Sequence, residues 1–107
     1  FNFAKRIVNL NKFLNKEKNE YILSKQILKS GTSIGANVFE AQNAQSNADF
    51  LSKMKIALKE ATETLYRLML LHETEYINDS AFSDLKADLD DIRNILGSIC
   101  KTTEANA

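Results

Sequence analysis

The sequence predicts an all-α protein, a single domain over residues 1–107 that folds as an antiparallel, left-handed, up-down-up-down four-helix bundle. Proline is absent and glycine occurs three times in 107 residues, so helix breakers and tight-turn residues are scarce. Apolar residues recur at spacings of three and four in four successive segments, the period of one buried helix face. Short polar stretches separate the segments, so consecutive helices must alternate in direction around a shared core.

The first expected helix covers about residues 2–15, and the polar run NKEKNE at 15–20 is the expected turn after it. Successive apolar residues in this segment are four, three and four positions apart, which places them on one side of a helix. The stripe consists of Phe3, Ile7, Leu10 and Leu14.

The second expected helix covers about residues 20–44 and contains the run SGTSIGAN, with Gly31 and Gly35 four positions apart. A phosphate-binding loop requires glycines in other spacings after a strand, and here an apolar helical stripe runs through the glycines without a change of phase. The run therefore predicts helix interior that a neighbouring helix approaches closely. That neighbour is either the third helix of the same chain or a helix of another subunit. The stripe is Leu23, Ile27, Ile34, Val38 and Ala41.

The third and fourth expected helices cover about residues 46–73 and 80–102. Ser46 is the expected N-cap of the third helix, with Asp49 in capping-box position, and Ser80 or Asp79 is the expected cap of the fourth. The apolar stripe of the fourth helix alternates spacings of three and four: Phe82, Leu85, Leu89, Ile92, Leu96 and Ile99.

Charge is distributed unevenly although the chain has no net charge. Residues 1–45 hold seven basic and three acidic side chains, and residues 74–107 hold three basic and seven acidic ones. A basic segment attracts phosphate or an acidic partner, but helices of opposite charge can also neutralise each other within the fold. The candidate nucleic-acid-binding residues are Lys5, Lys12, Lys16, Lys25 and Lys29, and no aromatic stacking platform is evident beside them.

No catalytic, cofactor-binding or metal-binding residue is predicted. His72, the single histidine, is expected at the end of the third helix, partly buried. Cys100, the single cysteine, is expected to be a buried, inert thiol, and it indicates a reducing compartment. Asp84, Asp88 and Asp91 form an acidic stripe that is expected to be solvated or ion-paired. With one histidine and no convergent set of polar residues, the expectation is a non-enzymatic protein. No apolar run is long enough for a membrane span, so the expected location is the cytoplasm.

Apolar residues outside the core stripes predict a second packing surface. Each mid-helix glycine costs up to about 1 kcal/mol relative to alanine, so two of them beside a core stripe suggest a compensating contact. Large apolar residues also project from the second and third helices away from their stripes, which predicts homo-oligomerisation. The candidate interface residues are Leu28, Gly31, Gly35, Phe39, Ile56, Tyr66 and Leu70.

The segment LSKQILKSGTSIGANVFEAQNAQSNADFLSKMKIALKEATETLYRLMLL, residues 23–71, resembles the bacterial four helix bundle protein family, also called the 23S rRNA intervening-sequence protein family. The resemblance extends through FAKRIVNL at 3–10 and ILGSICKT at 95–102. It implies an antiparallel four-helix bundle, a homopentamer, no enzymatic activity and no cofactor. Relatives include the accessory variability determinant of diversity-generating retroelements, which binds nucleic acid and a reverse transcriptase.

The positions that match the family pattern look structural or interfacial. Lys29 and Arg67 depart from it, because relatives commonly have arginine and tryptophan at these places. The matching residues are Ser30, Gly31, Ser33, Ile34, Gly35, Asn37, Glu40, Ala41, Asp49, Phe50, Lys53, Ala57, Leu58, Glu60 and Glu63.

Two functions follow from these features. The first is a homo-oligomeric scaffold that binds RNA, DNA or a ribonucleoprotein through the lysines of the first two helices, mainly by phosphate contacts. The second is an adaptor that binds another protein without direct contact to nucleic acid, with the acidic fourth helix helping to select the partner.

Overall fold

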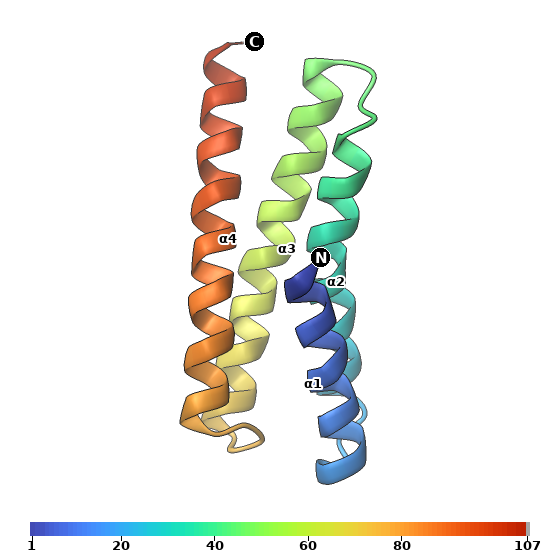
Figure 1. The fold of residues 1–107 in the computed structure, drawn as a ribbon, viewed down its shortest axis with the longest axis vertical. Helices are drawn as coiled ribbons and strands as arrows, with labels where there is room; N and C mark the ends of the chain where they lie inside the picture. Colours follow the sequence, from blue (N-terminus) through green and yellow to red (C-terminus); the bar gives the residue numbers. More distant parts are fainter. Residues whose placement is uncertain (107) are drawn as a thin grey trace.

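Each of the four expected segments is a helix in the computed structural model, which describes residues 1–106; Ala107 lies outside the described residues. The helices run antiparallel in sequence order, with extents of 47 × 21 × 19 Å (Figure 1). The predicted all-α four-helix class is therefore confirmed. The elements are α1 (Asn2–Lys18), α2 (Leu23–Ala41), α3 (Asn47–Glu73) and α4 (Asp79–Ala105).

The helix ends differ from the expected bounds by up to three residues for local reasons. α1 continues to Lys18 because its terminator is Asn19, a left-handed residue (φ 51°) whose N–H donates to the Leu14 carbonyl oxygen. α2 begins only at Leu23, and the Glu20 carboxylate accepts a hydrogen bond from the Ser24 backbone N–H at 2.9 Å. This carboxylate satisfies one of the backbone donors that the start of a helix leaves free.

The caps of α3 and α4 follow the same logic, with one correction. Ser46 caps α3 as predicted and accepts a hydrogen bond from the Asp49 N–H at 3.0 Å. The cap of α4 is Asn78 rather than Ser80 or Asp79, because Asn78 is the extended residue before the helix and its side chain accepts from the Ala81 N–H at 2.8 Å.

One core runs along the bundle and is built from the predicted stripes. Polar atoms enter it at a hydroxyl pair, in which Thr64 and Ser30 lie 3.0 Å apart and join α3 to α2. Thr64 also reaches the Glu60 carbonyl oxygen at 2.7 Å, so the buried hydroxyls are partnered. The largest apolar side chains with almost no exposed surface are Ile7, Leu14, Ile27, Leu68, Leu71 and Leu89.

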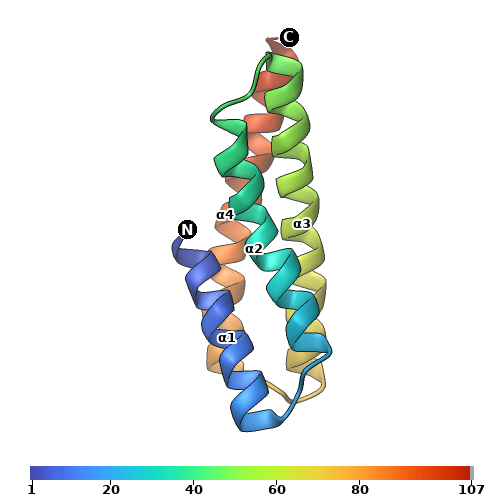
Figure 2. The same cartoon turned by 90° about the vertical axis from the view of Figure 1, so that its right-hand side faces the viewer.

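α1 covers only part of the bundle. It has 17 residues against 27 in each of α3 and α4, and the N-terminus lies about halfway along the long axis (Figures 1 and 2). α1 packs mainly on α2 and touches α4 only lightly.

Gly31 is the point where α1 and α2 approach most closely. A Cβ atom built on Gly31 would lie 2.8 Å and 2.9 Å from the two Cγ atoms of Ile7. A Cβ atom on Gly35, one turn further along, would meet nothing within 4 Å. The close approach at Gly31 is therefore made within the subunit, by α1 rather than by the third helix, whereas Gly35 faces open space.

His72 and Cys100 are both held within the scaffold. His72 stacks on Phe82 with ring centroids 4.2 Å apart, and its Nε2 lies 2.7 Å from an Asp79 carboxylate oxygen, so it joins the ends of α3 and α4. Cys100 is buried, with 5% of its surface exposed. Burial raises the pKa of the Cys100 thiol, and the nearby carboxylate of Glu104 raises it further, while Lys55 acts in the opposite direction.

Alanine at the two glycines should have opposite effects on stability. Gly31→Ala forces Ile7 or α1 to move, and we expect it to lower the free energy of unfolding by about 1–3 kcal/mol. Gly35→Ala meets no neighbour and should raise the free energy of unfolding by up to about 1 kcal/mol. Urea denaturation followed by circular dichroism measures both. A double-mutant cycle of Gly31→Ala with Ile7→Ala should show coupling, and equal effects at the two glycines would contradict this assignment.

Cys100 should react slowly in the folded protein. Alkylation requires the thiolate, and both burial and the raised pKa of the Cys100 thiol keep it protonated and covered at neutral pH. We expect iodoacetamide labelling to be at least about 100-fold slower than in the urea-unfolded chain, because the folded protein must open first. The pH profile of labelling should also lie at higher pH in the folded protein. Labelling at the unfolded rate would contradict the burial.

Candidate nucleic-acid interface

The five candidate lysines lie on the exposed sides of α1 and α2, and we refer to them as the basic surface. Lys5, Lys12 and Lys16 are spaced by seven and four residues, so they share one side of α1, away from its buried stripe. Lys25 and Lys29 are one turn apart on α2 and are also exposed. The structure thus brings together on one helix pair the residues predicted from charge alone.

None of these five lysines forms an ion pair with another residue in the described part of the chain, 1–106. Several cations of α3 and α4 are used internally instead. Lys53 pairs with Glu40 at 3.6 Å and Lys55 with Glu104 at 3.0 Å. Cations without carboxylate partners remain available to an external anion, so the polarity of the sequence is retained on the folded surface.

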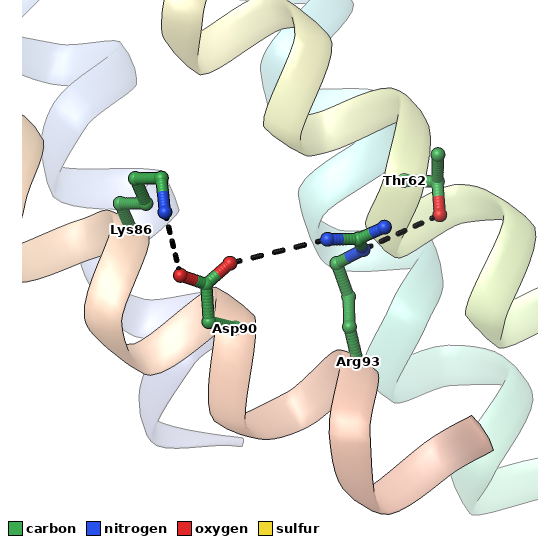
Figure 3. A network of polar contacts seen from close by, with 4 residues as sticks. All are labelled: Thr62, Lys86, Asp90 and Arg93. Atoms are coloured by element: carbon green, nitrogen blue, oxygen red, sulfur yellow. Dashed lines mark hydrogen bonds and ion pairs between the residues drawn. The ribbon is translucent and has the colours of Figure 1, made fainter.

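A polar network on α4 shows how the acidic half is neutralised (Figure 3). Asp90 accepts from the Lys86 ammonium at 2.7 Å, and the Arg93 guanidinium lies 3.9 Å from the other oxygen of the same carboxylate. Arg93 also reaches the Thr62 hydroxyl of α3 at 3.4 Å. This network joins two helices and leaves little net charge on that face.

The acidic stripe of α4 faces α1 and is only partly neutralised. Asp88 is hydrogen-bonded to the guanidinium of Arg6 across the two helices. Asp84 and Asp91, on either side of Asp88 along this stripe, are exposed. Within residues 1–106, no group of three or more His, Cys, Asp or Glu side chains is arranged to hold a metal ion.

The candidate interface residues fall into two groups. Leu28 is partly buried against the core, Gly31 is buried beneath Ile7, and Leu70 is partly buried. Gly35 borders open space, and three large apolar side chains are exposed: Phe39 (75%), Tyr66 (65%) and Ile56 (40%). The second group supplies apolar surface that another molecule could cover.

An apolar groove of about 770 Å³ is lined by residues at the start of α1, along α2 and by Ile92 of α4. Gly35, Val38 and Phe39 of α2 line one side of it and Ile92 of α4 lines the other. Gly35 leaves room for a side chain from outside, and the neighbouring Phe39 projects outward. A groove of this size and apolar lining can accommodate a helix or a large apolar side chain.

One exposed aromatic beside the basic surface was not predicted. Phe13 is adjacent in sequence to Lys12, lies about one turn from Lys16 on α1 and is 41% exposed. The apolar spacing of α1 gives a signal for it, because Phe13 falls outside the buried positions Leu10 and Leu14. An aromatic side chain among lysines can stack on a nucleobase, so it changes the chemistry of this surface.

Among residues 1–106, no helix is long and apolar enough to cross a bilayer.

Comparison with known proteins gives a family and a close structural relative. The family model of the 23S rRNA-intervening sequence protein matches residues 1–98. A crystal structure from Bacteroides thetaiotaomicron VPI-5482, a protein of unknown function from the S23 ribosomal protein family, superimposes with a TM-score of 0.92 at 56% sequence identity. The match covers 94% of this chain and 93% of that one. No curated protein matches the chain.

Proposed function

The chain belongs to the 23S rRNA-intervening sequence protein family, and from this premise we propose that it is a non-enzymatic, cytoplasmic, homo-oligomeric scaffold that binds RNA or a ribonucleoprotein. The observation that carries the proposal is the basic surface of α1 and α2, whose five lysines have no ion-pair partner among residues 1–106.

Binding through this surface depends mainly on phosphate contacts. Lysines on exposed helix sides act as point charges that displace counterions from the nucleic-acid backbone. Such contacts favour any RNA with accessible phosphates and weaken steeply with salt. The zero net charge of the chain is compatible with this function, because the carboxylates are concentrated in the last third of the sequence and the five lysines of the basic surface lie in the first third.

Homo-oligomerisation is the second component of the proposal, and family resemblance favours a pentamer. It is supported by the open groove at Gly35 and Phe39 and by the exposed side chains of Ile56 and Tyr66. The groove lies along α2 and α4, whereas Ile56 and Tyr66 lie on α3. The subunit therefore offers two different surfaces, and a head-to-tail ring uses two different surfaces of each subunit.

A second candidate, a protein-interaction adaptor, is favoured by the same groove and by the exposed carboxylates Asp84 and Asp91 of α4. A groove for an apolar helix with acidic residues nearby suits a basic amphipathic protein segment. Protein that remains oligomeric but binds no RNA at low salt would favour this candidate.

Charge reversal on α1 should weaken RNA binding in a salt-dependent manner. We expect Lys12→Glu combined with Lys16→Glu to raise the Kd for a hairpin RNA at least about tenfold at low salt. The slope of log K against log salt concentration should become shallower by about 0.7–0.9 for each lost phosphate contact. Fluorescence anisotropy with a labelled hairpin across a salt series measures both quantities.

The matched control changes two exposed lysines outside the basic surface, Lys59→Glu with Lys101→Glu. Both double variants have the same net charge, so a general electrostatic effect would weaken both equally. Equal weakening would reject this surface, and wild-type protein that shows no binding at low salt would reject the RNA-binding function.

Leucine at Gly35 should separate assembly from folding. No atom lies within 4 Å of a Cβ at Gly35, so Gly35→Leu should fold, whereas the added side chain occupies the groove and should dissociate the oligomer. Sedimentation velocity together with circular dichroism tests this prediction. Gly97→Leu is the matched control, because Gly97 also has no neighbour within 4 Å of a Cβ. Wild-type protein that sediments as a monomer at micromolar concentration would reject the assembly.

A further inference from the structure

A shallow hollow of about 380 Å³ lies beside the basic surface, between α1 and the start of α4. Its apolar floor is formed by Leu10, Ile77, Ala81 and Leu85, which belong to the core or pack against it. Phe13 borders the hollow and is partly exposed, so the hollow combines an apolar floor with an aromatic edge.

Two side-chain amides also line the hollow. The side chain of Asn9 makes no hydrogen bond to another residue within the described part of the chain. The Asn78 oxygen accepts from the Ala81 N–H at 2.8 Å, which leaves the two donors of its amide nitrogen for an external acceptor. Amides at the rim of an apolar hollow can bond the polar edge of a flat heterocycle that enters it.

Charge around the hollow is unequal on its two sides. On α1, Lys12 is adjacent to Phe13 in sequence, and Lys16 is one turn further along; both are exposed. On α4, Asp84 and Asp88 follow the hollow-lining Ala81, and Asp88 already holds Arg6. A phosphate is therefore attracted to the α1 side and repelled from the α4 side.

A third cation adjoins the aromatic ring. The Lys18 ammonium lies 5.9 Å from the centre of the Phe13 ring, within the range of a cation–π contact. Glu17, one turn beyond Phe13, is exposed, and its carboxylate repels phosphate. The phosphates of a bound strand are therefore expected on the side of Lys12 and Lys16. The lysines, the ring of Phe13 and the hollow are thus neighbours along α1.

We propose that this hollow binds one unpaired nucleobase of single-stranded RNA, stacked on Phe13, with the flanking phosphates on Lys12 and Lys16. This inference rests on the proposed RNA-binding function and specifies its ligand. A base within a duplex is stacked on both faces and paired along one edge, so it cannot enter the hollow. The site therefore selects loops, bulges and strand ends. Asn9 and Asn78 contact the edge of the base.

The test uses Phe13→Ala and a pair of RNA probes, a single-stranded dodecamer and the same strand annealed to its complement. Stacking of a base on an aromatic ring contributes to affinity, so we expect Phe13→Ala to weaken single-strand binding about 5- to 100-fold. Duplex binding and the salt slope should not change, because the lysines remain. Tyr21→Ala is the matched control, since Tyr21 is an exposed aromatic in the connection between α1 and α2 that does not line the hollow.

A fluorescent readout follows from the composition, because the chain contains no tryptophan. Phe13→Trp supplies a single indole that should retain single-strand binding and lose fluorescence when a base stacks on it, whereas Tyr21→Trp should not respond. Loss of binding equal to that of Tyr21→Ala, or an unquenched Phe13→Trp complex, would overturn the base site while leaving the RNA function intact. Absence of RNA binding by the wild-type protein at low salt would overturn the proposed function itself.

Discussion

The contact between Ile7 and Gly31 is the constraint on which the rest of the surface depends. Without a side chain at Gly31, α1 lies close to α2, and this approach fixes the direction of the lysines on both helices. Residues of α1 also line the apolar groove and the hollow beside Phe13. A shift of α1 away from Gly31 would therefore change the basic surface, the hollow and the groove together.

Internal ion pairing decides which charges a partner can use. Carboxylates of α4 are engaged by Arg6, Lys86 and Arg93, and two cations of α3 are engaged by Glu40 and Glu104. Each exposed pair contributes little to stability, typically under about 1 kcal/mol. Their larger consequence is electrostatic, since they reduce the field of α3 and α4 and leave α1 and α2 as the cationic part of a chain without net charge.

The helices and much of the core follow from apolar spacing, which is why the fold class was predicted correctly. The Ser46 cap was predicted correctly because Asp49 follows it in capping-box position. Helix ends were less predictable, because Asn19 ends α1 by adopting a left-handed conformation and Asn78 caps α4 ahead of two equally suitable residues. Gly31 and Gly35 look equivalent in sequence, and the tertiary contact of Gly31 with Ile7 of α1 distinguishes them. The hollow beside Phe13 involves residues from α1 and from the start of α4, about 70 positions apart, so no local pattern indicates it.

The proposed assembly and the proposed RNA binding would reinforce each other. A single bundle with a few lysines and one base site gives weak attachment, because each phosphate contact is exchanged readily for salt. If several subunits present the same α1 surface, a second contact by the same RNA becomes intramolecular, and its effective concentration raises the overall affinity without any new type of contact. The subunit can then remain neutral overall, since avidity replaces a high net charge. Under this arrangement a variant that dissociates the oligomer weakens RNA binding even though every lysine is retained, whereas a variant at Phe13 weakens binding without altering assembly.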